Sequence, residues 1–167
     1  KSSAASDVYK RQEIFLRFRE GTYAASDRVG QKSPEFSHKW GEHRFSSDQL
    51  EGQNCLLLFL DERGEFCKQA LQIAESVSLQ ENLTPVILYI EKQPENIENR
   101  SGAIILEYTG KTASEYGVTG YPTLFLLDPE GTIRFVKIGY SPLLAEELEL
   151  AVRQILHDRP IQAQKNK

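Results

Sequence analysis

The two cysteines, Cys55 and Cys67, are the residues whose side chains are best suited to covalent chemistry. A thiolate can attack a disulfide or a peroxide, and exchange with a disulfide substrate needs a second sulfur nearby to resolve the mixed disulfide. Cys55 begins the apolar run 55–60, which favours a buried structural cysteine. Cys67 has two open interpretations, a small apolar residue that packs a helix or a single reactive thiol. A bridge between the two would need Cα atoms within about 7 Å, which the sequence does not establish.

Composition narrows the classes of function. The chain has 167 residues, 40% of them hydrophobic and 26% charged, which predicts one globular domain. The net charge is −4 and the basic residues form no stripe, so nucleic acid is not an expected partner. No apolar run approaches the roughly 20 residues that a membrane helix needs, so no span is expected in this fragment. The three histidines and two cysteines lack metal-ligand spacing, and neither a metal nor another cofactor is expected.

The elements that would position Cys67 are a strand before it and a helix that contains it. Residues 54–60 and 85–90 are apolar without alternation, which is typical of strands covered on both faces. Between them, residues 66–80 place apolar side chains at helical spacing. This order predicts a right-handed βαβ unit with parallel strands.

The flanking segments complete the expected domain. Residues 123–127 and 132–138 surround an Asp-Pro-Glu-Gly turn and predict an antiparallel pair. We also expect a small hairpin around Trp40, a short helix over 111–116, and a final helix that the Ser141 hydroxyl caps. The predicted boundaries are a disordered or artefactual leader and linker over 1–28, one domain over 29–157, and a flexible tail over 158–167.

Four short segments carry a resemblance to a known family: residues 29–36, 57–60, 116–123 and 125–134. In this order and spacing they resemble the thioredoxin superfamily, in particular its TlpA/ResA-like and redoxin-domain branch. The resemblance implies an α/β thioredoxin fold, with a central mixed β-sheet flanked by helices on both faces and here an N-terminal β-hairpin extension. Relatives in this branch are often exported and tethered in bacteria, so the analogy implies the envelope or periplasm.

The resemblance also places the family's Cys-x-x-Cys motif on Gly64-Glu65-Phe66-Cys67. The first position is a glycine, which has no side chain to attack a disulfide. In the family, a carboxylate near the buried sulfur moves protons, and its two usual positions are occupied here by Leu58 and Ala70. The resemblance therefore implies a degenerate dithiol site in which Cys67 is the one candidate catalytic residue.

Tyr121-Pro122-Thr123 resembles the segment in which the family holds a cis-proline opposite the cysteine motif. In the family the backbone beside this proline pairs with an extended protein or peptide segment, in the manner of an added strand. The alternative is that the segment only shapes one end of a strand. Arg63 is near Cys67 in sequence, and Arg134 resembles an arginine that stabilises a thiolate in peroxiredoxins, so both are candidates for that role.

Three functions remain open. The first is a redox-inactive binding or structural module in a thiol-redox context. The second is a single-cysteine thiol oxidoreductase or peroxiredoxin-like enzyme that uses Cys67, although Leu60 and Gly64 stand where peroxiredoxins have a proline and a threonine. The third is a conventional thiol-disulfide oxidoreductase, which would require Cys55 to take part or a different position for the motif.

Overall fold

The computed structural model describes residues 25–95 and 102–165, with side chains described up to residue 155, so the expected leader lies largely outside the described residues. The helical elements are η1 (Ser47–Leu50), α3 (Glu65–Glu81), α4 (Gly110–Glu115) and α5 (Leu144–Lys165). The strands are β1 (Ser37–Trp40), β2 (His43–Ser46), β3 (Cys55–Leu60), β4 (Thr84–Tyr89), β5 (Ile104–Leu106), β6 (Thr123–Leu127) and β7 (Ile133–Ile138). Among the described residues, no helix is long and apolar enough to cross a bilayer.

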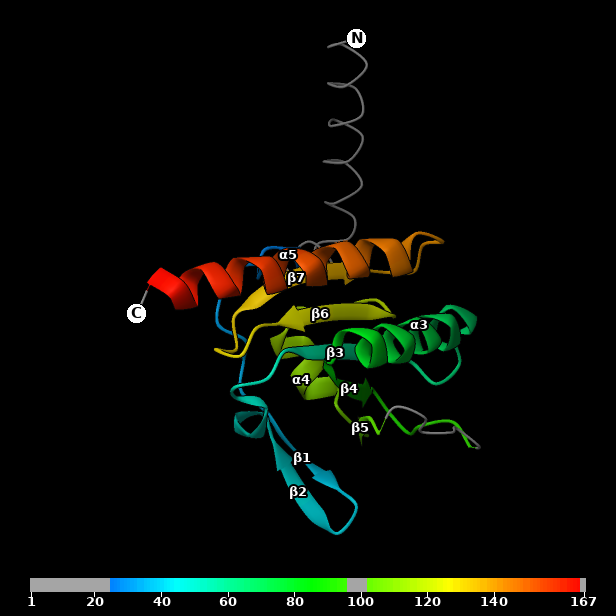
Figure 1. Cartoon of the computed structure of the whole chain (residues 1–167). Coiled ribbons are helices and arrows are strands. Elements are labelled where there is room, and N and C mark those ends of the chain that lie inside the picture. Colours follow the sequence, from blue (N-terminus) through cyan, green and yellow to red (C-terminus); the bar gives the residue numbers. More distant parts are fainter. Residues whose placement is uncertain (1–24, 96–101, 166–167) are drawn as a thin grey trace.

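The main sheet has the strand order β5-β4-β3-β6-β7, with β3 at its centre (Figure 1). The β3–β4 and β4–β5 pairs are parallel, whereas β3–β6 and β6–β7 are antiparallel. This confirms the predicted mixed sheet and βαβ unit, and β1 and β2 form the predicted N-terminal hairpin. The continuous apolar run predicts the central position correctly because every residue of β3 is buried.

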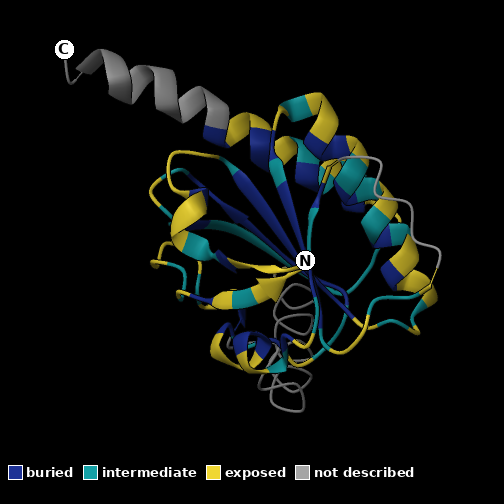
Figure 2. Ribbon diagram, turned by 90° about the horizontal axis from the view of Figure 1, so that it is seen from below, coloured by how far each residue is buried: buried dark blue, intermediate teal, exposed yellow. Residues whose placement is uncertain are grey.

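The two faces of β3 pack against different elements. Successive side chains of a strand point to opposite faces. Leu56, Leu58 and Leu60 therefore pack with α3 and α5, whereas Leu57 and Phe59 pack with the region around α4 and the hairpin. Figure 2 shows the buried strands as a dark layer, with exposed positions on the outer surfaces of the helices. The expectation of helices on both faces is confirmed.

The packed domain begins before the predicted boundary at residue 29. Ala25 is fully buried in the cluster that contains Phe36 and Phe45. The Gly30 N–H donates to the Ile133 carbonyl over 2.7 Å, so this segment lies along the start of β7. Its Gly, Ser and Asp content predicted a linker, but backbone hydrogen bonds of this kind do not require apolar side chains.

The beginning of α5 differs from the expected cap. The Ser141 hydroxyl lies 3.2 Å from the Glu147 carboxylate, and the Leu144 N–H is satisfied by the Ser141 carbonyl instead. The helix is then assigned through Lys165, beyond the expected end of the domain at residue 157.

Candidate functional site

The Gly64–Cys67 segment forms the first turn of α3, directly after the loop that leaves β3. Gly64 is the N-cap residue, and its carbonyl accepts hydrogen bonds from the N–H groups of Cys67 (3.1 Å) and Lys68 (3.3 Å). Its φ of −85° and ψ of 127° are ordinary for any L-residue. The backbone therefore does not require glycine at the position where the resemblance expects a cysteine.

Cys67 faces the space that a side chain at residue 64 would fill. An ideal Cβ built on Gly64 would lie 3.0 Å from the Cys67 Sγ and 3.4 Å from its Cβ. In a disulfide, the Cβ of one cysteine lies about 3.0 Å from the sulfur of the other, and the two Cβ atoms are about 3.5–4.5 Å apart. The positions of residues 64 and 67 in the first turn of α3 therefore have nearly the spacing of two cysteines in a disulfide, but only residue 67 carries a sulfur.

The Cys67 thiol is buried and its ionisation is disfavoured. Its exposed fraction is 4%, and it packs in the cluster between the sheet, α3 and α5. Burial is the main reason that the pKa of Cys67 is raised; a hydrogen bond from the Asp61 backbone lowers the pKa, and the negative charge of Asp61 raises it. A thiol needs the opposite shift to be a strong nucleophile at neutral pH.

We expect Cys67 to be alkylated slowly at neutral pH. With a raised pKa, less thiolate is present at pH 7, so the rate with iodoacetamide should be about tenfold or more below that of a cysteine in an unstructured peptide. The rate should increase only as the pH rises above the ordinary thiol pKa. The same chain in urea serves as the control. Rapid labelling at pH 7, with the midpoint of the rate-against-pH curve below the ordinary thiol pKa, would contradict the assignment of Cys67 as a buried thiol with a raised pKa.

Cys55 lies away from Cys67. Both thiols are free, and Cys55 packs in the cluster on the other face of the sheet from Cys67. Its sulfur lies 3.4 Å from the Gln53 carbonyl, and burial raises the pKa of Cys55 to about 12. The prediction that Cys55 is buried is confirmed, and in this structure its sulfur does not lie with that of Cys67.

The two arginines do not stabilise Cys67. Arg134 pairs with Asp128 over 3.4 Å, beside the β6–β7 turn. That turn lies next to Cys55 at the start of β3, whereas Cys67 follows the opposite end of that strand. Arg63 is exposed, and neither arginine is among the described groups that shift the pKa of Cys67. The family analogy for Arg134 fails because its Asp128 partner holds it at the far end of the sheet.

The Tyr121–Thr123 segment lies beside the start of α3. The Tyr121–Pro122 peptide bond is cis, as the resemblance implies. Tyr121 packs partly against the cluster that contains Cys67, and burial followed by the charge of Asp61 raises the pKa of its phenol. The Pro122 carbonyl accepts the Gly139 N–H over 2.8 Å, and the Thr123 hydroxyl donates to the Gly120 carbonyl over 2.7 Å. No hydrogen bond within the described residues uses the backbone N–H or carbonyl of Tyr121.

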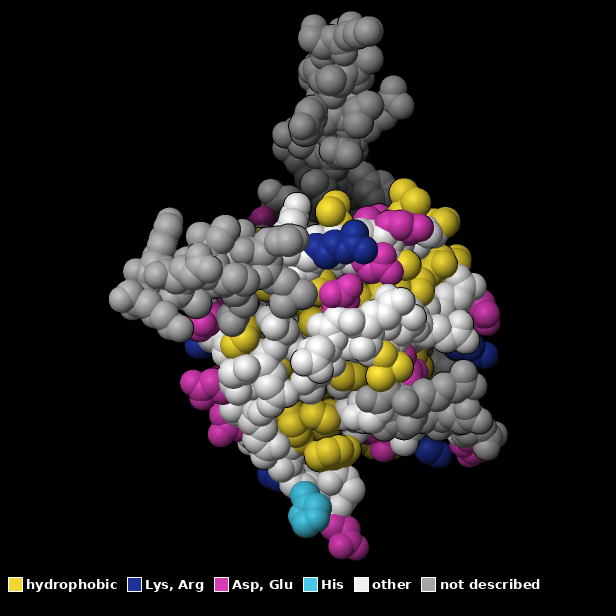
Figure 3. Space-filling view, in the orientation of Figure 1, with side chains coloured by type: hydrophobic (Ala, Val, Ile, Leu, Met, Phe, Trp, Pro, Cys, Tyr) yellow, Lys and Arg dark blue, Asp and Glu magenta, His cyan; other side chains and the backbone are white. Residues whose placement is uncertain are grey.

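An exposed apolar rim borders the motif. The Phe66 ring stacks on the Tyr140 ring, with centroids 5.3 Å apart and an interplanar angle of 10°. Phe66 and Leu143 are both mostly exposed, and Figure 3 shows hydrophobic side chains gathered near the start of α5. We call Phe66, Tyr140 and Leu143 the rim patch.

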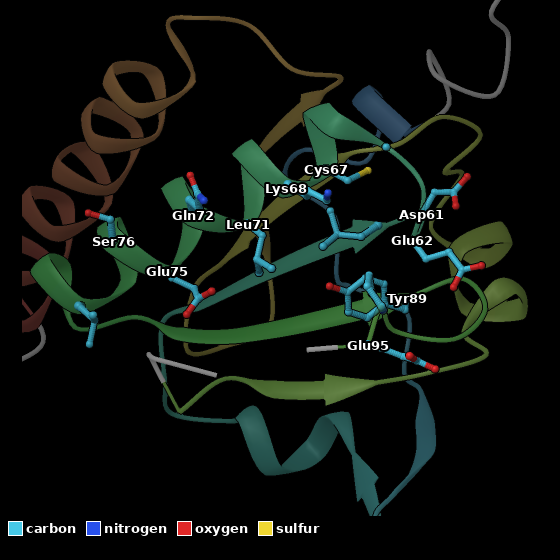
Figure 4. Close-up of a pocket in the computed structure, with 14 residues that line it drawn as sticks. Asp61, Glu62, Cys67, Lys68, Leu71, Gln72, Glu75, Ser76, Tyr89 and Glu95 are labelled. Carbon is cyan, nitrogen blue, oxygen red and sulfur yellow. The ribbon is translucent and has the colours of Figure 1, made fainter. Parts of the chain in front are cut away.

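The sequence patterns single out none of Asp61, Glu62, Glu75 and Tyr89. The structure brings all four to one cavity beside Cys67 (Figure 4). A pattern search has no means of finding this group, because its members come from the ends of two strands and the middle of a helix.

Comparison with known proteins identifies the fold. Neither a protein-family model nor a curated protein matches the chain. Its structure is similar to that of a protein proposed to be the thiol:disulfide interchange protein DsbE of Chlorobium tepidum, with a TM-score of 0.67 and 20% identity over 75% of this chain and 96% of that one. StoA from Bacillus subtilis has a TM-score of 0.54 and 25% identity, covering 71% of this chain and 96% of its own.

A peroxiredoxin also shares the architecture. The 2-Cys peroxiredoxin of Plasmodium vivax has a TM-score of 0.61 and 18% identity, covering 80% of this chain and 99% of its own. The chain therefore has the thioredoxin fold.

Proposed function

We propose that this thioredoxin-fold domain binds an extended protein segment and does not carry out dithiol–disulfide exchange. The observation that carries the proposal is the absence of a side chain at Gly64, the position that faces Cys67 at the start of α3. Exchange requires one sulfur to attack and a second to resolve the mixed disulfide. On the Cys67 face of the sheet, the described residues offer no second thiol.

Two features support binding at this end of the sheet. The backbone groups of Tyr121 have no hydrogen-bond partner among the described residues, and the neighbouring bonds of Pro122 and Thr123 hold the segment in place. An extended peptide can therefore add to Tyr121 as a strand adds to a sheet edge. The rim patch offers apolar contact area beside it, of the kind that marks interaction sites.

The absence of exchange is tested by insulin reduction with dithiothreitol. We expect the rate with this protein to equal the rate with dithiothreitol alone, because a single buried thiol cannot complete the cycle. A two-cysteine thioredoxin is the positive control. Turnover comparable to that control would overturn the proposal.

Binding is tested by NMR titration of the ¹⁵N-labelled chain with an unfolded polypeptide, such as reduced and carbamidomethylated ribonuclease. The amides of Tyr121 and Thr123 should shift, and those of the β1–β2 hairpin should not. Capping the ribonuclease thiols removes any covalent contribution from Cys67. Unchanged Tyr121 and Thr123 amides at saturating polypeptide would contradict the binding assignment.

A single-cysteine enzyme is the second candidate. The observation in its favour is that Cys67 lines a cavity and so has a route to small reactants, in a fold shared with a peroxiredoxin. This candidate requires hydrogen peroxide to convert the Cys67 thiol to a sulfenic acid, with water as the other product. Rapid trapping of that sulfenic acid by dimedone at neutral pH would favour it over the binding module.

A further inference from the structure

A cavity of about 890 Å³ runs along α3 from the motif to the last turn of the helix. One wall is a single face of α3, because Cys67, Leu71 and Glu75 recur at the helical period of three to four residues. The opposite wall comes from the end of β3 and from Tyr89 at the end of β4 (Figure 4). Its volume lies within the range of small-molecule sites.

The charges around this cavity are unbalanced. Four carboxylates line it, from Asp61, Glu62, Glu75 and Glu95. The Glu95 carboxylate lies 4.0 Å from the Lys92 ammonium group, which leaves the other three as the excess negative charge. Lys68 is the one cation among the described lining residues, and its ammonium group lies 4.0 Å from the carboxylate of Glu65 on the same helix. The potential in the cavity therefore favours a cation and opposes an anion. Glutathione, which carries a net negative charge, fits this lining poorly.

Two polar groups in the cavity make no hydrogen bond to a described residue. One is the Oε2 atom of Glu75, which is fully enclosed. The other is the hydroxyl of Tyr89, which lines the same cavity and is 2% exposed as a whole residue. Burial, followed by the nearby Cys67 and Glu75 groups, raises the pKa of the Tyr89 phenol, so the phenol remains neutral. Buried polar atoms without partners are uncommon in native proteins because desolvation is costly.

Apolar side chains on both walls complete the lining. Leu60, Leu71 and Leu79 line the cavity together with Pro94. Leu79 is 65% exposed, so the apolar surface continues from the interior to solvent. A ligand with a charged head and a hydrocarbon stem can place the stem along such a surface, as long basic side chains do in proteins.

We propose that this cavity binds a primary ammonium group on an apolar stem, with the ammonium held between the Glu75 carboxylate and the Tyr89 hydroxyl. The ammonium donates to both oxygens, and the stem lies on Leu71 and the neighbouring apolar side chains. The source is either a free aliphatic amine or the lysine side chain of a polypeptide. The site is separate from the Tyr121–Pro122 segment, so the inference goes beyond the proposed function.

The first experiment titrates the ¹⁵N-labelled full chain with n-pentylamine, n-pentanol and pentanoate and follows amide shifts by NMR. The three probes share a stem and differ in the charge of the head. We expect the amine to bind about tenfold or more tightly than the alcohol, with shifts at Tyr89 and Glu75, because charged hydrogen bonds are the stronger ones. Equal affinity for amine and alcohol, or tighter binding of pentanoate, would overturn the proposal.

Variants then assign the contacts. Glu75→Gln keeps the shape and removes the charge, and it should weaken amine binding about tenfold while leaving pentanol binding unchanged. Tyr89→Phe should weaken amine binding by a smaller factor. Glu81→Gln is the matched control, since Glu81 is on the same helix but does not line the cavity. Equal affinity of the Glu75 and Glu81 variants for pentylamine would also overturn the proposal, and unchanged pentanol binding confirms that a variant is folded.

Peptides distinguish the two sources. An acetylated and amidated Ala-Lys-Ala peptide is compared with the same peptide containing norleucine in place of lysine. Tighter binding of the lysine peptide than of pentylamine assigns the site to polypeptide side chains. Weaker binding of that peptide assigns it to free amines. If no amine binds but the Tyr121 amide still shifts in the ribonuclease titration, the amine site is rejected and the proposed function is unaffected.

Discussion

Replacing Gly64 with cysteine is expected to create a disulfide with Cys67 and to give the protein insulin-reducing activity. A Cβ at residue 64 would lie 3.0 Å from the Cys67 Sγ, which is close to the spacing of about 3.0 Å across a disulfide. The backbone at Gly64 has a negative φ, so a side chain there adds no backbone strain, and forming the disulfide turns the close approach to Cys67 into bonded geometry. The substitution thus supplies the one atom that exchange lacks.

The new thiol would also be the better nucleophile of the two. Residue 64 is the N-cap of α3, where the unpaired N–H groups and the helix dipole lower a thiol pKa. Cys67 would act as the resolving sulfur from its buried position. We expect insulin reduction at least about tenfold above the dithiothreitol background, because both steps of exchange become possible. The rate should remain below that of a thioredoxin, since Leu58 and Ala70 provide no proton acceptor.

Gly64→Ser is the matched control. It places the same Cβ against Cys67 but adds no sulfur, so it should leave insulin reduction at background. Thiol counting under denaturing conditions provides an independent readout, since only Cys55 should react in the oxidised Gly64→Cys variant. An oxidised variant that keeps all its thiols would mean that the first turn of α3 does not have the spacing described above.

Most of the fold could be predicted because its local patterns agree with its tertiary environment. The apolar run of β3 predicted a central strand, and β3 is buried on both faces. The short strand β5 could not be placed, since three apolar residues fit a strand or a helix equally well. The segment from Ala25 to Arg28 was predicted as a linker, but it is held by backbone hydrogen bonds that leave no trace in side-chain composition.

The candidate site also has one part that the sequence predicts and other parts that it does not. The position of Gly64 at the start of α3 follows from the spacing after β3, so sequence was sufficient there. The role predicted for Arg134 fails because a strand residue is directed by its neighbours, here Asp128 across the turn. The cavity of Glu75 and Tyr89 escaped prediction because it depends on how α3 lies over β4, a tertiary relationship that no local pattern encodes.

Phe59→Ala is expected to have the largest effect on stability. Phe59 is fully buried, and its ring lies against Tyr116 (5.4 Å between centroids) and Phe125 (5.7 Å). Removing a ring from such a cluster leaves a cavity and costs about 3–5 kcal/mol. Because single domains are stable by only about 5–15 kcal/mol, urea unfolding followed by circular dichroism should show a large fall in midpoint.

Phe66→Ala is the contrasting variant, because Phe66 is mostly exposed and its ring stacks on Tyr140 at the rim. It should change the free energy of unfolding by less than about 1 kcal/mol. The difference in unfolding free energy between the two variants distinguishes a residue that stabilises this end of the sheet from a residue of the rim patch that is available for binding. Phe59 pairs with Thr123 in the β3–β6 register, so the variant removes a ring at the position paired with the strand residue that follows Pro122. Similar midpoints for the two variants would mean that the aromatic cluster under β3 does not set the stability of this end of the sheet.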